Sequence, residues 1–390
     1  MKEGDMYMST IARVFALSLL ALGMFIYPQE VLNSASGGLA LWWHFVLPAL
    51  LPFFILSELL MAAGFVHFLG ALLESFMRPV FRLPGKAAFV VAMGFTSGFP
   101  MGAVLTARLR QAGEISRVEG ERLLAFTNNP SPGFMFGAVA SGMLGKPTLG
   151  IILSSSIYLA NLLVGFLFRF YRVTPGPPLS SRLPSFKRAW QEMKDAQTKD
   201  NRAFGQILSE AIKQSITTVL MVAGFMAFFS VILRLLNIWN VIAFLAALVH
   251  IVIKGIPIPF LQAFFNGLFE MTLGCQVTIQ AVSELNYQVA LLTLLMGWSG
   301  LSVFAQVAGF ISETDLRFSP FVVARILQGI IALGLSQLFL LVADVPTSSL
   351  VLQVPSTSVL FWNTWHSSSY VFMVIMTLLF MVALVRQPRS

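Results

Sequence analysis

Two short motifs interrupt apolar runs with residues that can bind a ligand. TSGFPMG contains Ser97, Gly98, Pro100 and Gly102, and GWSGLS contains Ser299, Gly300 and Ser302, with Gln306 on a nearby face if a helix begins at Gly300. An interior Gly costs a helix about 1 kcal/mol and Pro about 3 relative to Ala, so the interruptions need a local purpose. Helices broken there would present backbone N–H groups to an anion such as a carboxylate. The competing interpretation is a Gly/Pro kink that lets helices pack closely.

A third interruption, FTNNPSPGF at residues 126–134, carries two neutral amides, Asn128 and Asn129, followed by Ser131 between two prolines. The prolines forbid a continuous helix. Two interpretations stay open: a re-entrant hairpin, which we favour, or an ordinary capped helix start just outside the membrane.

Three charged residues lie in or beside apolar segments. Glu270, in FNGLFEMTLGCQ, is expected to act in gating, proton carriage or cation binding, because a carboxylate inside a membrane is costly and by default functional. A buried structural pair or an interfacial location is the alternative. Glu58, in FFILSELLM, receives the same interpretation with less weight. Arg325 could meet an anionic substrate, although snorkelling to the interface is the commoner role and the one we favour.

No sequence motif supports an enzyme. The four histidines lack metal-ligand spacing, and no protease, P-loop, hydrolase or dinucleotide motif occurs. The single cysteine, Cys275, excludes an intrachain disulfide and a cysteine-based zinc cluster. We therefore expect no catalytic residue, no metal and no cofactor.

The positioning elements must be membrane helices. Hydrophobic residues make up 57% of the 390 residues, charged residues 11%, and the mean hydropathy is +0.80. We predict an all-α polytopic membrane protein with about eight to ten crossings and some broken or re-entrant segments. The predicted spans are 11–27, 39–66, 148–168, 216–236, 238–253, 256–282, 289–311, 320–343 and 367–385. We interpret 11–27 as a retained helix, with a cleaved signal peptide as the minor alternative.

The net charge of +8 reflects topology rather than nucleic-acid binding, because the basic residues lie in short loops between apolar spans. Residues 172–213 hold eight Lys/Arg against four acidic residues and include the stretch TPGPPLSSRLP. This segment is predicted to be a cytoplasmic basic linker.

A spacing of about 203 residues relates the two sides of that linker. It aligns Met93 with Met296, Ser116 with Ser319, and Arg122 with Arg325. We therefore predict two structural repeats, 1–171 and 214–390. Interrupted helices at matching places in two repeats indicate the substrate site of a secondary transporter.

The motifs SGFPMGAVLTARLRQAGEISRVEGERLLAFTNNPSPGFMFGAV, GLFEMTLG and GLSVFAQVAGFISETDLRFSPFVVARILQG resemble the YlbJ or SpoVV family of sporulation integral membrane proteins. The resemblance covers nearly the whole chain apart from the N-terminus and the linker. It implies a gate (nucleoside recognition) domain in each repeat. It also implies transport of dipicolinic acid across the mother-cell-derived outer forespore membrane.

Two other function classes stay open. One is a scaffold or assembly factor for the spore cortex that transports nothing, and the other is a transporter of a nucleoside-like metabolite. The expected partners are a small anion, the lipid bilayer and, as a further option, another copy of the chain or other sporulation membrane proteins. No nucleic acid is expected.

Overall fold

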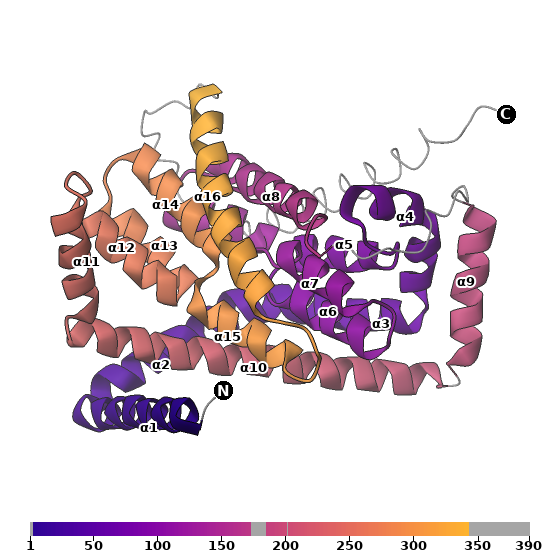
Figure 1. Ribbon diagram of the computed structural model, residues 1–390, viewed down its shortest axis with the longest axis horizontal. Coiled ribbons are helices and arrows are strands. Elements are labelled where there is room, and N and C mark those ends of the chain that lie inside the picture. Colours follow the sequence, from indigo (N-terminus) through magenta and orange to yellow (C-terminus); the bar gives the residue numbers. More distant parts are fainter. Residues whose placement is uncertain (1–2, 173–184, 201, 343–390) are drawn as a thin grey trace.

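The computed structural model describes residues 3–172, 185–200 and 202–342, and in these ranges every regular element is helical (Figure 1). The α-helices are α1 Glu3–Ile26, α2 Pro28–Leu41, α3 Leu47–Ala62, α4 Phe65–Phe81, α5 Ala87–Ser97, α6 Met101–Gln111, α7 Arg117–Phe126, α8 Leu149–Phe168, α9 Phe186–Lys199, α10 Phe204–Ile238, α11 Val241–Val252, α12 Ile258–Phe269, α13 Met271–Ala281, α14 Leu285–Trp298, α15 Gly300–Ile311 and α16 Ser319–Val342. Two π-helices, η1 Trp42–Val46 and η2 Gly133–Met143, complete the described elements. The predicted all-α fold is confirmed.

The described residues contain four helical segments long and apolar enough to cross a membrane: Leu149–Phe168, Phe204–Ile238, Leu285–Ile311 and Ser319–Val342. Two bent pairs raise the number to six: Val14–Ile26 with Pro28–His44, bent by 102°, and Leu50–Ala62 with Phe65–Phe81, bent by 81°. The predicted spans 238–253 and 256–282 correspond to short helices, α11 and the pair α12 and α13. The predicted span 367–385 lies outside the described residues.

Helix α10 connects the two halves of the molecule. Its 35 residues extend for about 52 Å, much longer than one crossing requires. It packs against α2 and α3 from the first half and against α11 and α15 from the second, and runs along one edge of the molecule in Figure 1. Its first turns and α9 occupy much of the predicted linker, so that segment contains regular helix.

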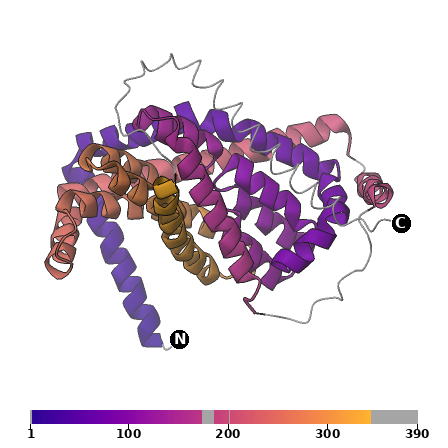
Figure 2. The same ribbon diagram turned by 90° about the horizontal axis from the view of Figure 1, so that it is seen from above.

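One buried apolar cluster lies among α3, α4 and α5, and a second lies where α16 packs between α8 and α14. Large apolar side chains on α1, α8 and α10 point outward. Such exposed apolar surface is typical of contact with lipid. Figure 2 shows α1 projecting from the remaining helices. The chain is thus an integral membrane protein whose broken helices are enclosed by other helices.

The two halves use matching elements around their breaks. Met93 lies on α5 and Met296 on α14, whereas Ser116 immediately precedes α7 and Ser319 begins α16. The capping box formed by Ser116 and Glu119 fixes the start of α7. The halves then differ, because α7 ends at Phe126, before the asparagine pair, while α16 continues to Val342.

Candidate functional site

The first break separates α5 from α6. Gly98 has φ of +84°, a conformation that favours glycine, and Phe99–Pro100 is a cis peptide. The backbone N–H of Ala103, in the first turn of α6, donates to Asn128 Oδ1 at 3.0 Å. Asn128 therefore satisfies a helix N-terminus from another segment. Ser97 is the last residue of α5 and does not cap α6.

Three glycines hold this break against residues 127–131. A Cβ at Gly94 or at Gly102 would lie 2.2 Å from the carbonyl oxygen of Thr127. A Cβ at Gly98 would lie 2.6 Å from the backbone nitrogen of Ser131. The glycines are therefore required by close backbone approach, and they bring Asn128 to α6.

The asparagine segment is buried. Asn128 and Asn129 have no exposed surface, and Asn128 Nδ2 donates to the carbonyl of Leu124 at 3.1 Å. Ser131 Oγ accepts from the backbone N–H of Phe134 at 3.2 Å, at the start of η2. This burial argues against a solvent-exposed helix start and agrees with an interior, re-entrant segment.

The second break separates α14 from α15. Ser299 and Gly300 have φ of +81° and +83°, and α15 begins at Gly300, which meets the condition set for Gln306. Ser302 and Gln306 follow one turn apart on α15, and both are buried. A Cβ at Gly300 would lie 2.9 Å from the backbone nitrogen of Met271. This break is therefore packed directly against the junction of α12 and α13.

Glu270 lies at that junction, at the tip of a tight helical hairpin. A Cβ at Gly274 would lie 2.1 Å from Gly267 Cα, whereas residues seven apart in one continuous helix lie about 10.5 Å apart. Glu270 is 6% exposed, and its carboxylate accepts from the backbone N–H of Leu273 at 2.7 Å. The carboxylate therefore caps α13 beside the second break.

Arg325 is fully buried on α16, so its predicted snorkelling to the interface is wrong. Its guanidinium donates to the carbonyls of Asn128 and, at 2.7 Å, Ala125, and to Asn161 Oδ1 at 3.2 Å. The carbonyls at the end of α7 lack helical partners, and this second-half arginine satisfies them. Its predicted repeat partner Arg122 likewise donates to backbone carbonyls.

Two amides that the sequence analysis missed complete the same layer. Gln328, one turn after Arg325 on α16, donates to Asn129 Oδ1 at 3.1 Å. Asn161, on α8, donates to the carbonyl of Phe126. Both residues could have been found from the sequence, because each is an amide within an apolar helix. Such a side chain needs a hydrogen-bond partner inside a membrane.

The two breaks lie next to one another. Phe99 of the first break and Trp298 of the second pack against one apolar cluster, which includes residues of α6, α7, α15 and α16. Around these breaks, within the part of the chain that the structure describes, five buried side-chain atoms have no hydrogen-bond partner: Ser97 Oγ, Asn129 Nδ2, Ser299 Oγ, Arg325 Nε and Gln328 Oε1. Four of the five can donate and three can accept. Donors thus exceed acceptors, as suits a ligand rich in acceptor oxygens.

Glu58 does not join these groups. It lies on α3 and forms an ion pair with Arg108 of α6, beside a polar cavity of about 280 Å³. Among the described residues, no three His, Cys, Asp or Glu side chains are grouped so that they could hold a metal ion.

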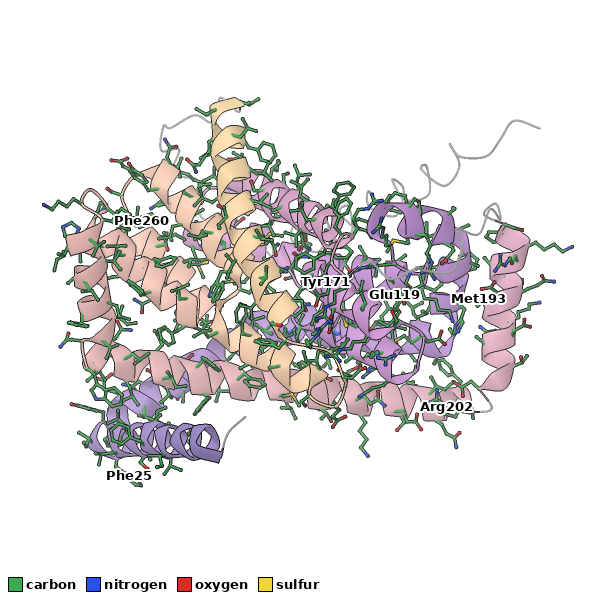
Figure 3. All side chains as sticks on the ribbon, viewed as in Figure 1. Phe25, Glu119, Tyr171, Met193, Arg202 and Phe260 are labelled. Carbon is green, nitrogen blue, oxygen red and sulfur yellow. The ribbon has the colours of Figure 1, made fainter. Side chains whose placement is uncertain are left out.

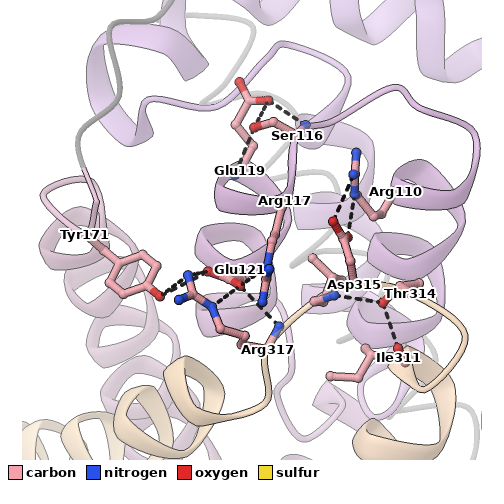
Figure 4. Close-up of polar contacts among 11 residues, drawn as sticks. Arg110, Ser116, Arg117, Glu119, Glu121, Tyr171, Ile311, Thr314, Asp315 and Arg317 are labelled. Carbon is pink, nitrogen blue, oxygen red and sulfur yellow. Dashed lines mark hydrogen bonds and ion pairs between the residues drawn. The ribbon is translucent and has the colours of Figure 1, made fainter.

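A polar clamp joins the halves at one end of the broken helices (Figure 4). Glu121 of α7 is fully buried and accepts from Arg317 Nε at 2.8 Å and Nη2 at 2.7 Å. Tyr171 and Arg117 also donate to this carboxylate. Nearby, Asp315 receives two hydrogen bonds from Arg110, at 2.8 and 3.1 Å. Residues 312–318 of the second half are thereby fastened to α6 and α7.

The clamp should make stability depend on pH. Burial raises the pKa of Glu121, but hydrogen bonds from Arg317, Tyr171 and Arg117 outweigh it and lower that pKa from 4.5 to about 2. A depressed pKa contributes stability above the unfolded value, and this is lost as pH falls from about 4.5 towards 2. We expect Glu121→Gln to lower the free energy of unfolding by about 1–3 kcal/mol at neutral pH. In thermal unfolding scans, the stability of this variant should fall less steeply as the pH is lowered. Glu313→Gln, in the 312–318 loop that the clamp fastens, is the control. If both variants lost stability equally between pH 4.5 and about 2, this role of Glu121 would be contradicted.

The packed, broken helices and their buried polar layer define an all-α polytopic membrane protein. The Gate family model, described as "Nucleoside recognition", matches residues 44–175, which include the first break and the asparagine segment. The chain is 45% identical over 312 residues to the sporulation integral membrane protein YlbJ of Bacillus subtilis (strain 168), covering 78% of this chain and 76% of that protein. The chain therefore belongs to the YlbJ family of sporulation integral membrane proteins.

A more distant relative is an uncharacterised protein of Alkalihalophilus pseudofirmus, 23% identical over 303 residues, which cover 75% of this chain and 61% of that protein. No solved structure matches the chain.

Proposed function

We propose that this protein transports a small organic anion, specifically dipicolinic acid, across the outer forespore membrane during sporulation. The observation that carries the proposal is the set of unpartnered, mostly donating groups at the paired breaks. A buried donor or acceptor without a partner costs about 1–3 kcal/mol, and a bound acceptor would recover that cost. Dipicolinate is a planar dianion whose carboxylates and ring nitrogen all accept hydrogen bonds.

The predicted residues, together with Gln328, take complementary roles in this proposal. Ser97, Asn129, Ser299 and the α16 pair of Arg325 and Gln328 offer polar groups to the substrate. Asn128 holds the start of α6 in place. Gly98, Pro100, Gly102 and Gly300 form the breaks, Ser131 caps η2, and Ser302 and Gln306 extend the polar layer along α15. Glu270, at the hairpin tip, provides gating or proton coupling.

The described arrangement corresponds to a closed state. Ser97 is 2% exposed and Ser299 has no exposed surface, so substrate can enter only if the elements around the breaks separate. The hairpin tip at Glu270 and the clamp at Glu121 are the contacts that such a movement would change. Sporulation, which the related protein's name states, fits an anion carrier and also fits the rival scaffold.

The test is uptake of labelled dipicolinate into proteoliposomes containing the purified full chain. We expect Ser97→Ala combined with Ser299→Gly to lower uptake at low substrate by about 10-fold or more, because two hydrogen bonds to a charged ligand are lost. Stability should hold or rise, because neither hydroxyl has a partner in the described chain and glycine suits φ of +81° at residue 299.

A matched control replaces two exposed residues, Asn33→Ala with Ser312→Ala. Asn128→Ala is a further variant, expected to reduce both uptake and stability because it also uncaps α6. Uridine as competitor tests the nucleoside alternative. Absence of dipicolinate uptake by folded protein under every ion gradient would overturn the proposal in favour of a scaffold.

A further inference from the structure

Two adjoining cavities, both open to the surface, lie away from the breaks beside α3, α4, α6, α9 and α10. One, of about 420 Å³, is lined by Arg108, Glu210, Lys213, Gln214, Thr217 and Thr218. The other, of about 280 Å³, shares Glu210 and Gln214 with it and reaches Glu58, His67 and Arg202. Figure 3 places Arg202 at the corner where α10 begins. Either volume exceeds that of a small dicarboxylate.

We propose that these cavities form an outer binding site for a small carboxylate anion, with Lys213 and Arg108 as its cationic groups. The proposal rests on the proposed function in one respect only: the anion bound here is the one that later reaches the breaks.

Three carboxylates and three Lys or Arg side chains line the two cavities, and Lys213 is the cation that forms no ion pair among the described residues. Each lining carboxylate already faces a guanidinium: Glu58 pairs with Arg108, while Asp200 and Glu210 both pair with Arg202. The Lys213 ammonium, the amide of Gln214 and the guanidinium of Arg108 line the same space from α10 and α6. The lining of this 420 Å³ cavity alone holds two cations, Arg108 and Lys213, against one acid, Glu210, so a carboxylate placed there meets a local excess of positive charge.

The cavity is linked to the first break through α6. Arg108 follows Met101, the first residue of α6, by seven positions, which is about 10.5 Å along a helix. On α3, Ser57 Oγ contacts Met101 Sδ at 3.8 Å while the adjacent Glu58 holds Arg108. An anion in the cavity therefore lies about two helical turns from the predicted central site.

Glu58 acts in this arrangement as a resident competitor. Its carboxylate pairs with Arg108 until the carboxylate of an incoming anion displaces it. Glu58 would therefore act at the outer site and not at the breaks. Neutralising Glu58 should strengthen anion binding. Neutralising Lys213 should weaken it.

The test measures equilibrium binding of labelled dipicolinate to the purified full chain in detergent, beside uptake into proteoliposomes. The binding assay uses protein carrying Ser97→Ala and Ser299→Gly, which weakens binding at the breaks and lets the outer site contribute more of the signal. We expect Lys213→Gln to raise the dissociation constant about threefold to fivefold and to weaken its salt dependence, as for a partly exposed ion pair. Glu58→Gln should lower that constant. Lys254→Gln, an exposed lysine outside the cavities, is the matched control.

The outcomes separate the two proposals. In uptake assays, Lys213→Gln should raise the half-saturating concentration and leave the maximal rate unchanged. Binding that depends on Lys213 in a protein that transports no dipicolinate would support the outer site and overturn the proposed function. Equal dissociation constants for Lys213→Gln and Lys254→Gln, or absence of dipicolinate binding, would overturn the proposal of an outer site.

Discussion

Replacing Arg325 with leucine should destabilise the protein by about 3–5 kcal/mol and abolish uptake. The side chain has no exposed surface and supplies hydrogen bonds to Asn128, Ala125 and Asn161. Each hydrogen bond from a charged group contributes about 1.5–3 kcal/mol, and its removal leaves buried carbonyls without partners. Loss of the cation–π contact between Arg325 and Phe321, at 5.3 Å, adds to the effect. Thermal unfolding of purified protein in detergent measures the change.

Two further variants separate this role from a general loss of charge. Arg325→Lys should be intermediate, because an ammonium cannot reach three acceptors in the geometry of a planar guanidinium. Arg234→Leu removes an exposed arginine whose partner is Glu30, and should cost less than about 1 kcal/mol. If Arg325→Leu unfolded at the same temperature as Arg234→Leu, the arginine would not hold the asparagine segment.

Asn161→Leu tests the same network from α8. Asn161 accepts from Arg325 and donates to the carbonyl of Phe126, so the two side chains support one stretch of backbone. Residues that share partners show non-additive effects. The double variant Asn161→Leu with Arg325→Leu should therefore lose less stability than the sum of the losses in the two single variants.

The positions of the breaks could be predicted from the sequence because they depend on local backbone chemistry. Gly98 and Pro100 cannot continue a helix without a penalty, and Gly300 takes a positive φ that other residues resist. The 203-residue spacing aligns Ser116, which precedes α7, with Ser319, the first residue of α16, and the two repeats stay a prediction. The information that locates the breaks lies within a few residues of each one.

The partners of the polar groups could not be predicted, because they depend on packing between distant segments. Arg325 lies near the start of a long apolar run, where snorkelling is the common outcome. Its acceptors instead lie about 200 residues earlier in the chain. Gln328 and Asn161 were missed for the same reason. Glu58 was predicted to act in gating or ion coupling, because its sequence position does not reveal Arg108 beside it.

Gly102→Ala should destabilise the protein and reduce uptake, although alanine normally favours a helix. In α6 the added Cβ would lie 2.2 Å from the carbonyl oxygen of Thr127, which is backbone and cannot rotate away. Overpacking of this kind costs about 1–3 kcal/mol, more than the roughly 1 kcal/mol of helix propensity gained. Because Thr127 immediately precedes Asn128, its displacement would also move the amide that holds the start of α6.

Glycines elsewhere in the chain supply the control with the opposite sign. Gly224, in α10, has nothing within 4 Å of an added Cβ, so Gly224→Ala should stabilise the protein by up to about 1 kcal/mol. Gly94→Ala would meet the same Thr127 oxygen as Gly102→Ala. Once one substitution has displaced Thr127, the second should cost less, so the pair should be non-additive in thermal unfolding. Equal stabilisation by Gly102→Ala and Gly224→Ala would show that the break tolerates a side chain. If Gly102→Ala destabilises the protein while Gly224→Ala stabilises it, the glycines of the first break are needed for the close approach of the asparagine segment. If Gly102→Ala also loses uptake, that close approach is needed for transport.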